Sequence, residues 1–231
     1  MLKRNAIYNS ASRQWRKVPV RIREPIWRFV QSWSGEDYQR IAFHGKVYRR
    51  GTNRAKSYRQ LFPQPPRDAK ILDVGANLGY YSLRAIEEGA AYCRAVDIEA
   101  DNVAFIRTVA DDLKIDNLDV VKADIARYPV ERDFDVILCL NVLHHFPDLE
   151  AAEAIIEKLY RRASSKLVLM VLAPDEAGVR HSFDTDPDPL GGKRFLRISP
   201  HHVSDLYRRV KVEIAPAKSY GPNRYVIIIH K

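Results

Sequence analysis

The chain has 231 residues, 46% of them hydrophobic, with a formal net charge of +9 and two cysteines. This length supports one large core with an accessory element and is short for two domains of normal size. Cys93 and Cys139 lie in apolar segments, which predicts buried thiols in a reducing compartment and excludes a disulfide framework. No Cys/His cluster has zinc-site spacing, so we expect no metal.

The first 60 residues carry the whole basic excess, with a net charge of +12 against −3 for the remainder. Apolar residues at three- and four-residue steps predict a short amphipathic helix over residues 24–33. This segment would suit an anionic membrane surface, RNA phosphates, or a phosphorylated lipid or glycan carrier. It would equally suit packing on the rest of the protein with its arginines in solvent. Because the sequence has neither a long apolar run nor a signal-peptide core, we expect a cytoplasmic protein, with peripheral membrane contact left open.

Residues 43–66 are rich in arginine and tyrosine and end in a proline-rich joint. We place the domain boundary here, with a basic N-terminal helical extension or lid at residues 1–66 and the main domain at 67–231. Tyr48, Arg54 and Tyr58 are candidates for binding a substrate. The simpler alternative is that they pack within the lid.

An apolar run ending at Asp73 leads into a turn that contains Gly75 and Gly79, and a helix is expected from near Tyr80. Since glycine has no β-carbon, a ligand could approach the amides of this turn, where the helix start favours an anionic or electron-rich group. The spacing lacks the third glycine of the dinucleotide motif and the Lys-Ser/Thr of a P-loop. It therefore argues against NAD and ATP.

Two further apolar strands end in acids, Asp97 and Asp124. Because parallel strands direct their carboxyl ends to one edge of a sheet, these carboxylates and Asp73 should face a common crevice. An acid at such a strand end can accept hydrogen bonds from both hydroxyls of a ribose. Capping of the following helix is the structural alternative for each acid taken alone.

A fourth strand, from Phe134, leads into a polar turn that contains Asn141, His144 and His145. The same rule places this turn beside a bound ligand. A histidine is suited to accept a proton, because its ordinary pKa near ~6.5 leaves it largely neutral at cytoplasmic pH.

The C-terminal part predicts a helix over 149–162, a strand over 166–172 and a helix that starts at Ser199 and Pro200 and runs to about 209. A closing hairpin is expected from residues 211–214 and 225–230. We interpret the long segment 173–198 as acceptor-binding, with disorder as the alternative.

From Ala69 to Lys231 the chain resembles the class I S-adenosylmethionine-dependent methyltransferases, whose first motif has the shape seen at Asp73 to Gly79. The resemblance implies an α/β fold with a doubly wound, mostly parallel seven-stranded sheet and an antiparallel last strand, here with the N-terminal helical extension. It implies S-adenosyl-L-methionine as cofactor, with Asp97 holding the ribose and Asp124 the adenine. The implied cofactor-binding residues are Asp73, Gly75, Ala76, Asn77, Gly79, Asp97, Ile98, Asp124, Ile125 and Asn141.

In some O-methyltransferases of this family, the position of His144 holds the general base, and His145 stands where they have aspartate. We therefore expect His144 and His145 to be the catalytic residues. The expected function is methyl transfer to an O or N acceptor on a small molecule or a lipid- or glycan-type substrate. Two alternatives remain: an RNA (tRNA) methyltransferase that uses the basic segment to bind phosphates, and a non-catalytic scaffold that only binds the cofactor.

Overall fold

The computed structural model describes residues 39–176, 178–183, 195–221 and 223–231. The predicted helix over 24–33 and part of the predicted loop over 173–198 lie outside these residues. The described strands form a seven-stranded sheet in the order β10-β11-β7-β6-β3-β4-β5. This order confirms the predicted doubly wound sheet.

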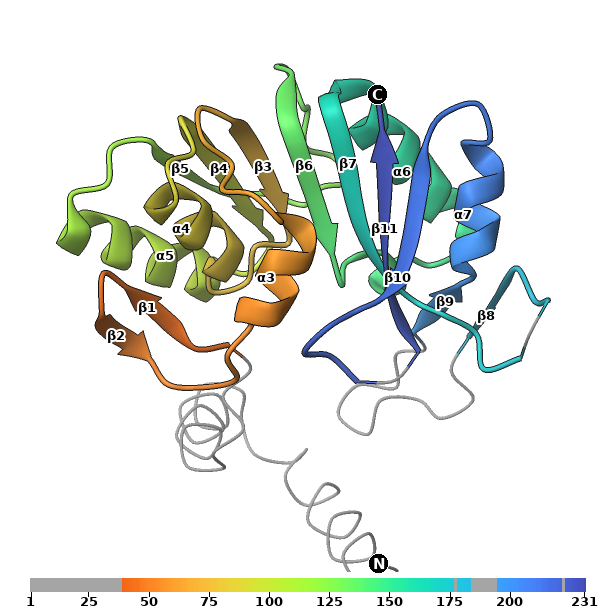
Figure 1. The fold of residues 1–231 in the computed structure, drawn as a ribbon, viewed down its shortest axis with the longest axis horizontal. Coiled ribbons are helices and arrows are strands. Elements are labelled where there is room, and N and C mark those ends of the chain that lie inside the picture. The colour runs from red at the N-terminus through yellow and green to blue at the C-terminus, as the bar shows by residue number, and fades with distance from the viewer. Residues whose placement is uncertain (1–38, 177, 184–194, 222) are drawn as a thin grey trace, which may run out of the picture.

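Five strands, from β7 to the edge strand β5, run parallel, and buried apolar residues dominate them, as expected for parallel strands between two layers of helices. Their arrowheads point to the lower edge of the sheet in Figure 1. The bounds are β3 (Lys70–Val74), β4 (Tyr92–Asp97), β5 (Leu118–Lys122), β6 (Phe134–Leu140) and β7 (Ala163–Leu172).

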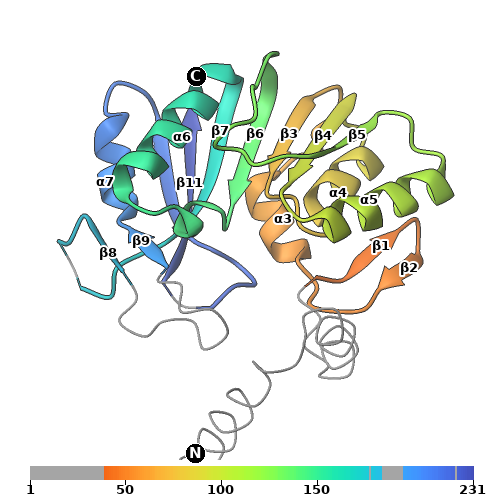
Figure 2. The same cartoon turned by 180° about the vertical axis from the view of Figure 1, so that it is seen from behind.

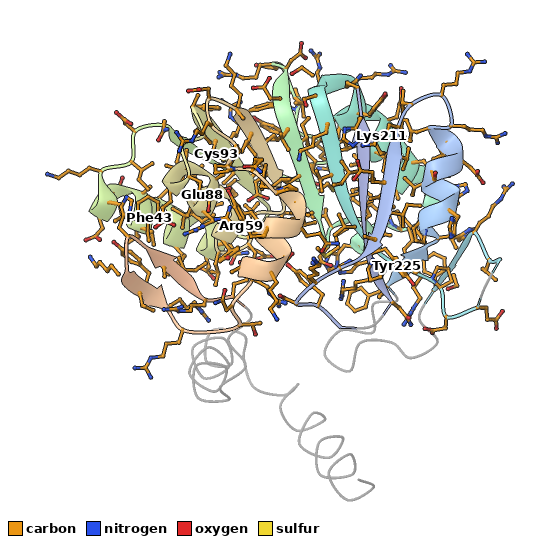
Figure 3. The ribbon with its side chains drawn as sticks, viewed as in Figure 1. Phe43, Arg59, Glu88, Cys93, Lys211 and Tyr225 are labelled. Atoms are coloured by element: carbon orange, nitrogen blue, oxygen red, sulfur yellow. The ribbon has the colours of Figure 1, made fainter. Side chains whose placement is uncertain are left out.

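The last two strands, β10 (Val212–Pro216) and β11 (Arg224–His230), form the predicted closing hairpin. Strand β11 runs antiparallel to β7, with Arg224 opposite Leu172. Because of this direction, β11 begins at the edge where the parallel strands end. Figure 3 shows Tyr225 at this lower edge and Lys211 near the opposite one.

Helices cover both faces of the sheet. Side chains of α3 (Ala55–Leu61), α4 (Tyr80–Glu87) and α5 (Ala100–Leu113) pack in one apolar cluster with alternate residues of the strands. The other cluster takes the remaining strand residues together with α6 (Leu149–Arg162) and α7 (Pro200–Leu206). Figure 2 shows the face covered by α6 and α7. Cys93 and Cys139 are both fully buried and free, as predicted.

Residues 39–66 pack on the main domain through apolar side chains. Strands β1 (Ile41–Phe43) and β2 (Lys46–Arg49) pair as a hairpin below α4 and α5 (Figure 1). Ile41, Phe43, Tyr58 and Leu61 are at most 6% exposed and belong to the same cluster as α4 and α5. Ion pairs add to this contact, including Arg59 with Glu88 at 2.7 Å (Figure 3).

Two C-terminal details differ from the expectations. Within the predicted loop, β8 (His181–Phe183) pairs with β9 (Leu196–Ile198), so this segment carries its own antiparallel ribbon. Ser199 occupies the N-cap position of α7, but its side chain makes no capping hydrogen bond, and the helix ends at Leu206. No helix among the described residues has the length and apolar character needed to cross a membrane.

Candidate functional site

The turn between β3 and α4 is shaped by three residues with positive φ, namely Gly75 (67°), Asn77 (52°) and Gly79 (78°). Its amides bond within the protein: the Gly75 and Ala76 N–H groups donate to the Val96 carbonyl at 2.8 and 3.1 Å, and Gly79 donates to Ala76 at 2.8 Å. The expectation that a ligand sits on these amides is therefore wrong for these three. Their partners instead hold the turn against the end of β4.

The two glycines are also required by packing. A β-carbon on Gly75 would lie 2.3 Å from Cγ2 of Val142, and one on Gly79 would lie 2.9 Å from Cγ1 of Ile106. A side chain at either position would thus collide with the protein, and the positive φ adds backbone strain. Protein side chains, rather than a ligand alone, account for the missing β-carbons.

Asp97 ends β4 with a carboxylate that is 7% exposed. Its Oδ2 accepts from the Asn77 amide at 2.7 Å, and its Oδ1 accepts from the Glu99 amide at 2.9 Å and the Asn102 side chain at 3.1 Å. Three of about four lone-pair positions are therefore occupied, which leaves one on Oδ2 for a ligand hydroxyl. Asp97 both fixes the glycine turn and faces the cavity described below.

Asp73, near the end of β3, is 2% exposed and accepts a hydrogen bond from the Ser82 hydroxyl at 2.7 Å. Burial raises its pKa to about 7, with a further increase from the Asp97 charge, while the Ser82 bond opposes the rise. This carboxyl is thus poised to change charge near neutral pH.

Asp124 follows β5, and its Oδ1 accepts from the Ala126 amide at 2.9 Å, so it caps the local turn. Ile98 lies between the two strand-end acids along the chain and is 58% exposed. Together with Ile125, it gives this part of the site an apolar surface on which a planar base could lie.

These residues line one cavity of about 800 Å³ at the carboxyl edge of the sheet. The described lining residues are Gln39, Asp73, Gly75, Ala76, Asn77, Tyr81, Val96, Asp97, Ile98, Glu99, Asn102, Ala123, Asp124, Ile125, Ala126, Leu140, Asn141, Val142, His144, His145, Phe146, Pro147 and Arg224. The cavity thus brings together every predicted cofactor-binding residue except Gly79, and both predicted catalytic histidines.

At the end of β6, Asn141 adopts a positive φ of 57° and its side-chain oxygen accepts a hydrogen bond from the Arg224 guanidinium. The next turn, η1 (Leu143–His145), carries the two histidines, whose ring centroids lie 4.0 Å apart. His144 packs edge-on against Phe195, with centroids 5.0 Å apart.

His144 is 9% exposed, and its buried Nδ1 has no hydrogen-bond partner among the described residues. Burial lowers its pKa to about 3, with smaller contributions from His145 and the Arg224 charge. The imidazole is therefore neutral at physiological pH but a weak proton acceptor.

The sequence analysis missed several lining residues, among them the polar side chains of Gln39, Tyr81, Asn102 and Arg224. Arg224 could have been found, because an antiparallel last strand must begin at the edge where the parallel strands end. Asn102, in the first turn of α5, could also have been inferred from the strand-end acid before it. Gln39 has no recognisable sequence signal, since only the packing of residues 39–66 on the main domain places it here.

Tyr48, Arg54 and Tyr58, the predicted substrate-binding residues, do not line the cavity. The Tyr48 hydroxyl donates to Asp112 on α5, and Tyr58 is 1% exposed beside Phe62. Arg54 donates to the Ser219 carbonyl and stacks over the Tyr220 ring at 4.0 Å. A ligand in this cavity would not touch these three side chains.

Arg54 still connects to the cavity through a chain of hydroxyls. Tyr81, which lines the cavity, shares hydrogen bonds with Ser57 at 2.8 Å and with Tyr220 at 2.9 Å. This hydroxyl chain ties α3 and α4 to the turn before β11. Among the described residues, those of the cavity included, no group of three or more His, Cys, Asp or Glu side chains is placed to hold a metal ion.

The family model described as a methyltransferase domain matches residues 71–165, which include the three strand-end acids and both histidines. A search of curated proteins found no match.

Among solved structures, magnesium protoporphyrin IX methyltransferase from Synechocystis PCC 6803 with bound SAH aligns with a TM-score of 0.60 and 18% identity, over 77% of this chain and 80% of that chain. The 1,6-didemethyltoxoflavin-N1-methyltransferase from Burkholderia thailandensis, with bound S-adenosylhomocysteine, aligns with a TM-score of 0.58 and 20% identity, over 77% of each chain. The glycopeptide N-methyltransferase MtfA aligns with a TM-score of 0.57 and 11% identity, over 76% of this chain and 92% of that chain.

The structural likeness confirms the predicted fold, and the family match lies on the part of the sheet that builds the cavity. The acids and the glycine turn of this cavity are the features expected for a sulfonium nucleoside. Residues 71–165 match the methyltransferase-domain family, and the fold is that of solved methyltransferases with bound S-adenosylmethionine or S-adenosylhomocysteine.

Proposed function

We propose that this methyltransferase acts on an oxygen or nitrogen atom of a small-molecule, lipid- or glycan-type acceptor that binds beside His144. The observation that carries the proposal is the single cavity shared by Asp97, Asp124 and His144. Structural neighbours named for porphyrin and toxoflavin-type compounds support a small-molecule acceptor.

The two ends of the cavity support different tasks. On the β4 and β5 side, the free lone pair of Asp97 suits a ribose hydroxyl, and the Asp124 carboxylate suits the amino group of adenine. Ile98 offers an apolar surface for the base between them. On the β3 side, Asp73 lies where an ammonium group of the methionine portion would stabilise its ionised form.

S-adenosylmethionine, when bound, supplies an electrophilic methyl group on a positively charged sulfur. The residues of this chain would then contribute chiefly by position, holding the acceptor atom in line and excluding water. Asn141, held by Arg224 at the end of β6, and the turn with His144 form the wall where that acceptor atom would lie.

For His144 we propose an orienting hydrogen bond between its imidazole, which lines the cavity, and the acceptor. A pKa of about 3 makes it a poor general base near pH 7, because an effective base has a pKa close to the working pH. His145 is exposed at the rim and adjoins the same cavity. It remains a candidate for taking up a proton where the acceptor releases one.

The proposal is tested with the full-length protein in two steps. Isothermal titration calorimetry with S-adenosylhomocysteine measures cofactor-site binding, and we expect a saturable site with 1:1 stoichiometry. Incubation with methyl-labelled S-adenosylmethionine and fractionated cell extract then locates the acceptor. Label in the small-molecule, lipid or glycan fractions supports the proposal, whereas label confined to RNA would overturn it.

The charge of the N-terminal segment favours a second candidate, an RNA methyltransferase. Residues 1–60 carry a net charge of +12, enough for several phosphate contacts. RNA binding through this segment should weaken steeply as salt increases, and a binding isotherm at two salt concentrations measures that slope. The same segment could hold the enzyme at an anionic membrane, which flotation with anionic vesicles would detect.

A further inference from the structure

Charge is distributed unevenly along the cavity. Its acids, Asp73, Asp97, Glu99 and Asp124, come from the ends of β3, β4 and β5. Arg224 comes from the start of β11 and is the one lysine or arginine among the described lining residues. Strands β11 and β5 are five positions apart in the sheet, on the order of 24 Å at about 4.8 Å per strand. The cavity therefore has an acidic end and a basic end.

The basic end coincides with the acceptor side. Figure 3 shows Tyr225, which follows Arg224, at the edge where β6 ends. The Arg224 guanidinium reaches the side chain of Asn141 directly after β6. His144, from the turn that follows, lies close enough for the arginine charge to lower its pKa. Arg224 and His144 thus flank the space that the proposed function gives to the acceptor.

Arg224 is half-buried, and no carboxylate of the described residues lies within ion-pair distance of it. Asp175, three residues after the β7 position opposite Arg224, pairs with Arg197 at 3.1 Å and with Asn223. Of the five guanidinium N–H groups, the bond to Asn141 uses one. A partly desolvated arginine with donors to spare is suited to bind an oxyanion in a planar, two-point contact.

The neighbouring histidine fits the same ligand. Its imidazole lines the same cavity and carries an N–H that can donate to a ligand oxygen. Because His144 is a weak base, an acceptor that must lose a proton would gain little from it. An oxyanion needs no base, since its lone pair is already available.

We propose that the acceptor presents an oxyanion to Arg224 and His144 and that this oxyanion receives the methyl group. This inference rests on the proposed function and names its substrate class, a carboxylate or a phosphorus oxyacid. A lone pair of the oxyanion forms the new O–CH₃ bond while the S–CH₃ bond breaks and its electron pair stays on sulfur. The sulfonium becomes a neutral thioether, the oxyanion loses one negative charge, and no proton is released.

The methionine carboxylate of the cofactor is the alternative partner for Arg224. The two assignments differ in what Arg224→Gln changes. If Arg224 binds the acceptor, the variant should keep its affinity for S-adenosylhomocysteine within a few fold, while KM for the acceptor rises about ten- to hundred-fold, as loss of a charge-assisted contact predicts. If the cofactor affinity falls by the same factor, Arg224 serves the cofactor and the inference is wrong.

The acceptor class is tested with full-length enzyme, methyl-labelled S-adenosylmethionine and cell-extract small molecules split by anion exchange. A carboxyl ester releases its label as volatile methanol after mild alkali, whereas a phosphate or phosphonate monoester keeps it on an anionic compound. Either result supports the inference, and a pH indicator should then record no proton release per turnover. Alkali-stable label on compounds that were never anionic would overturn it.

Matched variants separate this inference from the proposed function. Arg224→Lys keeps the charge and should recover part of the KM loss, while Arg209→Gln, exposed and outside the cavity, should behave as wild type. S-adenosylhomocysteine binding with transfer to a neutral alcohol or amine overturns the oxyanion alone. Failure to bind S-adenosylhomocysteine overturns the proposed function, and the inference falls with it.

Discussion

Replacing Asp97 tests the cofactor site most directly, because this carboxylate is both a wall of the cavity and a support of the glycine turn. Its two oxygens accept three hydrogen bonds, from Asn77 at 2.7 Å, Glu99 at 2.9 Å and Asn102 at 3.1 Å. Asp97→Ala removes all three, together with the lone pair available to a ribose hydroxyl. The Asn77 amide then loses the partner that holds the turn against β4.

The expected loss follows from these contacts. A hydrogen bond to a charged group contributes about 1.5–3 kcal/mol, so losing the ribose contact alone weakens binding roughly ten- to hundred-fold. Displacement of the glycine turn should cause a comparable further loss of binding free energy. We therefore expect Asp97→Ala to lower the affinity for S-adenosylhomocysteine at least about hundred-fold, to the limit of detection by calorimetry.

Two controls make the result specific. Asp111→Asn removes an exposed acid from α5 and should leave the affinity unchanged. Asn102→Ala removes only the longest of the three bonds and should cost a few fold. Thermal unfolding of each variant shows whether it is folded. A folded Asp97→Ala protein that binds S-adenosylhomocysteine as tightly as wild type would refute the assignment of Asp97 and the argument built on its lone pair.

Two further predictions concern buried titratable groups. Because the pKa of Asp73 is raised to about 7 in the folded protein, its contribution to stability is complete below about pH 4 and is lost as pH rises through 7. Between pH 5 and pH 8, the free energy of unfolding of Asp73→Asn should therefore rise by about 3 kcal/mol relative to that of wild type, as measured by urea unfolding. Curves of unfolding free energy against pH that run parallel for the two proteins would contradict this. His144→Ala should lower kcat on the order of 100-fold through misplacement of the acceptor, with S-adenosylhomocysteine affinity within a few fold. Since the pKa of His144 is about 3, the wild-type rate profile should have no limb near pH 6.5 from this residue, and full activity of the variant would exclude any role for it.

The sequence predicted the central strands and the acids at their ends well, for a physical reason. A parallel strand is buried on both faces, so its apolar run is conspicuous, and the first polar residue after it must lie at the carboxyl edge. The sequence alone therefore predicts that Asp97 and Asp124 line one cavity. The same reasoning located the turn with His144.

The remaining features depended on tertiary contacts that the local pattern does not contain. Gly75 must lack a β-carbon because Val142, 67 positions later in the chain, packs against it. The pKa of His144 is low because its side chain is buried, and no sequence motif predicts that burial. The arginine-rich surroundings of Tyr58 favour a substrate-binding role. Helical spacing with Leu61 would instead have indicated a buried face.

The hydroxyl chain through Ser57, Tyr81 and Tyr220 limits how far the protein can be truncated from its N-terminus. A recombinant version that starts at residue 67, the boundary we proposed, would delete Ser57 and leave a cavity-lining tyrosine with half of its hydrogen bonds. It would also strip the apolar cover of Ile41, Phe43 and Leu61 from α4 and α5 and leave them open to aggregation. Shortened versions should begin before residue 39.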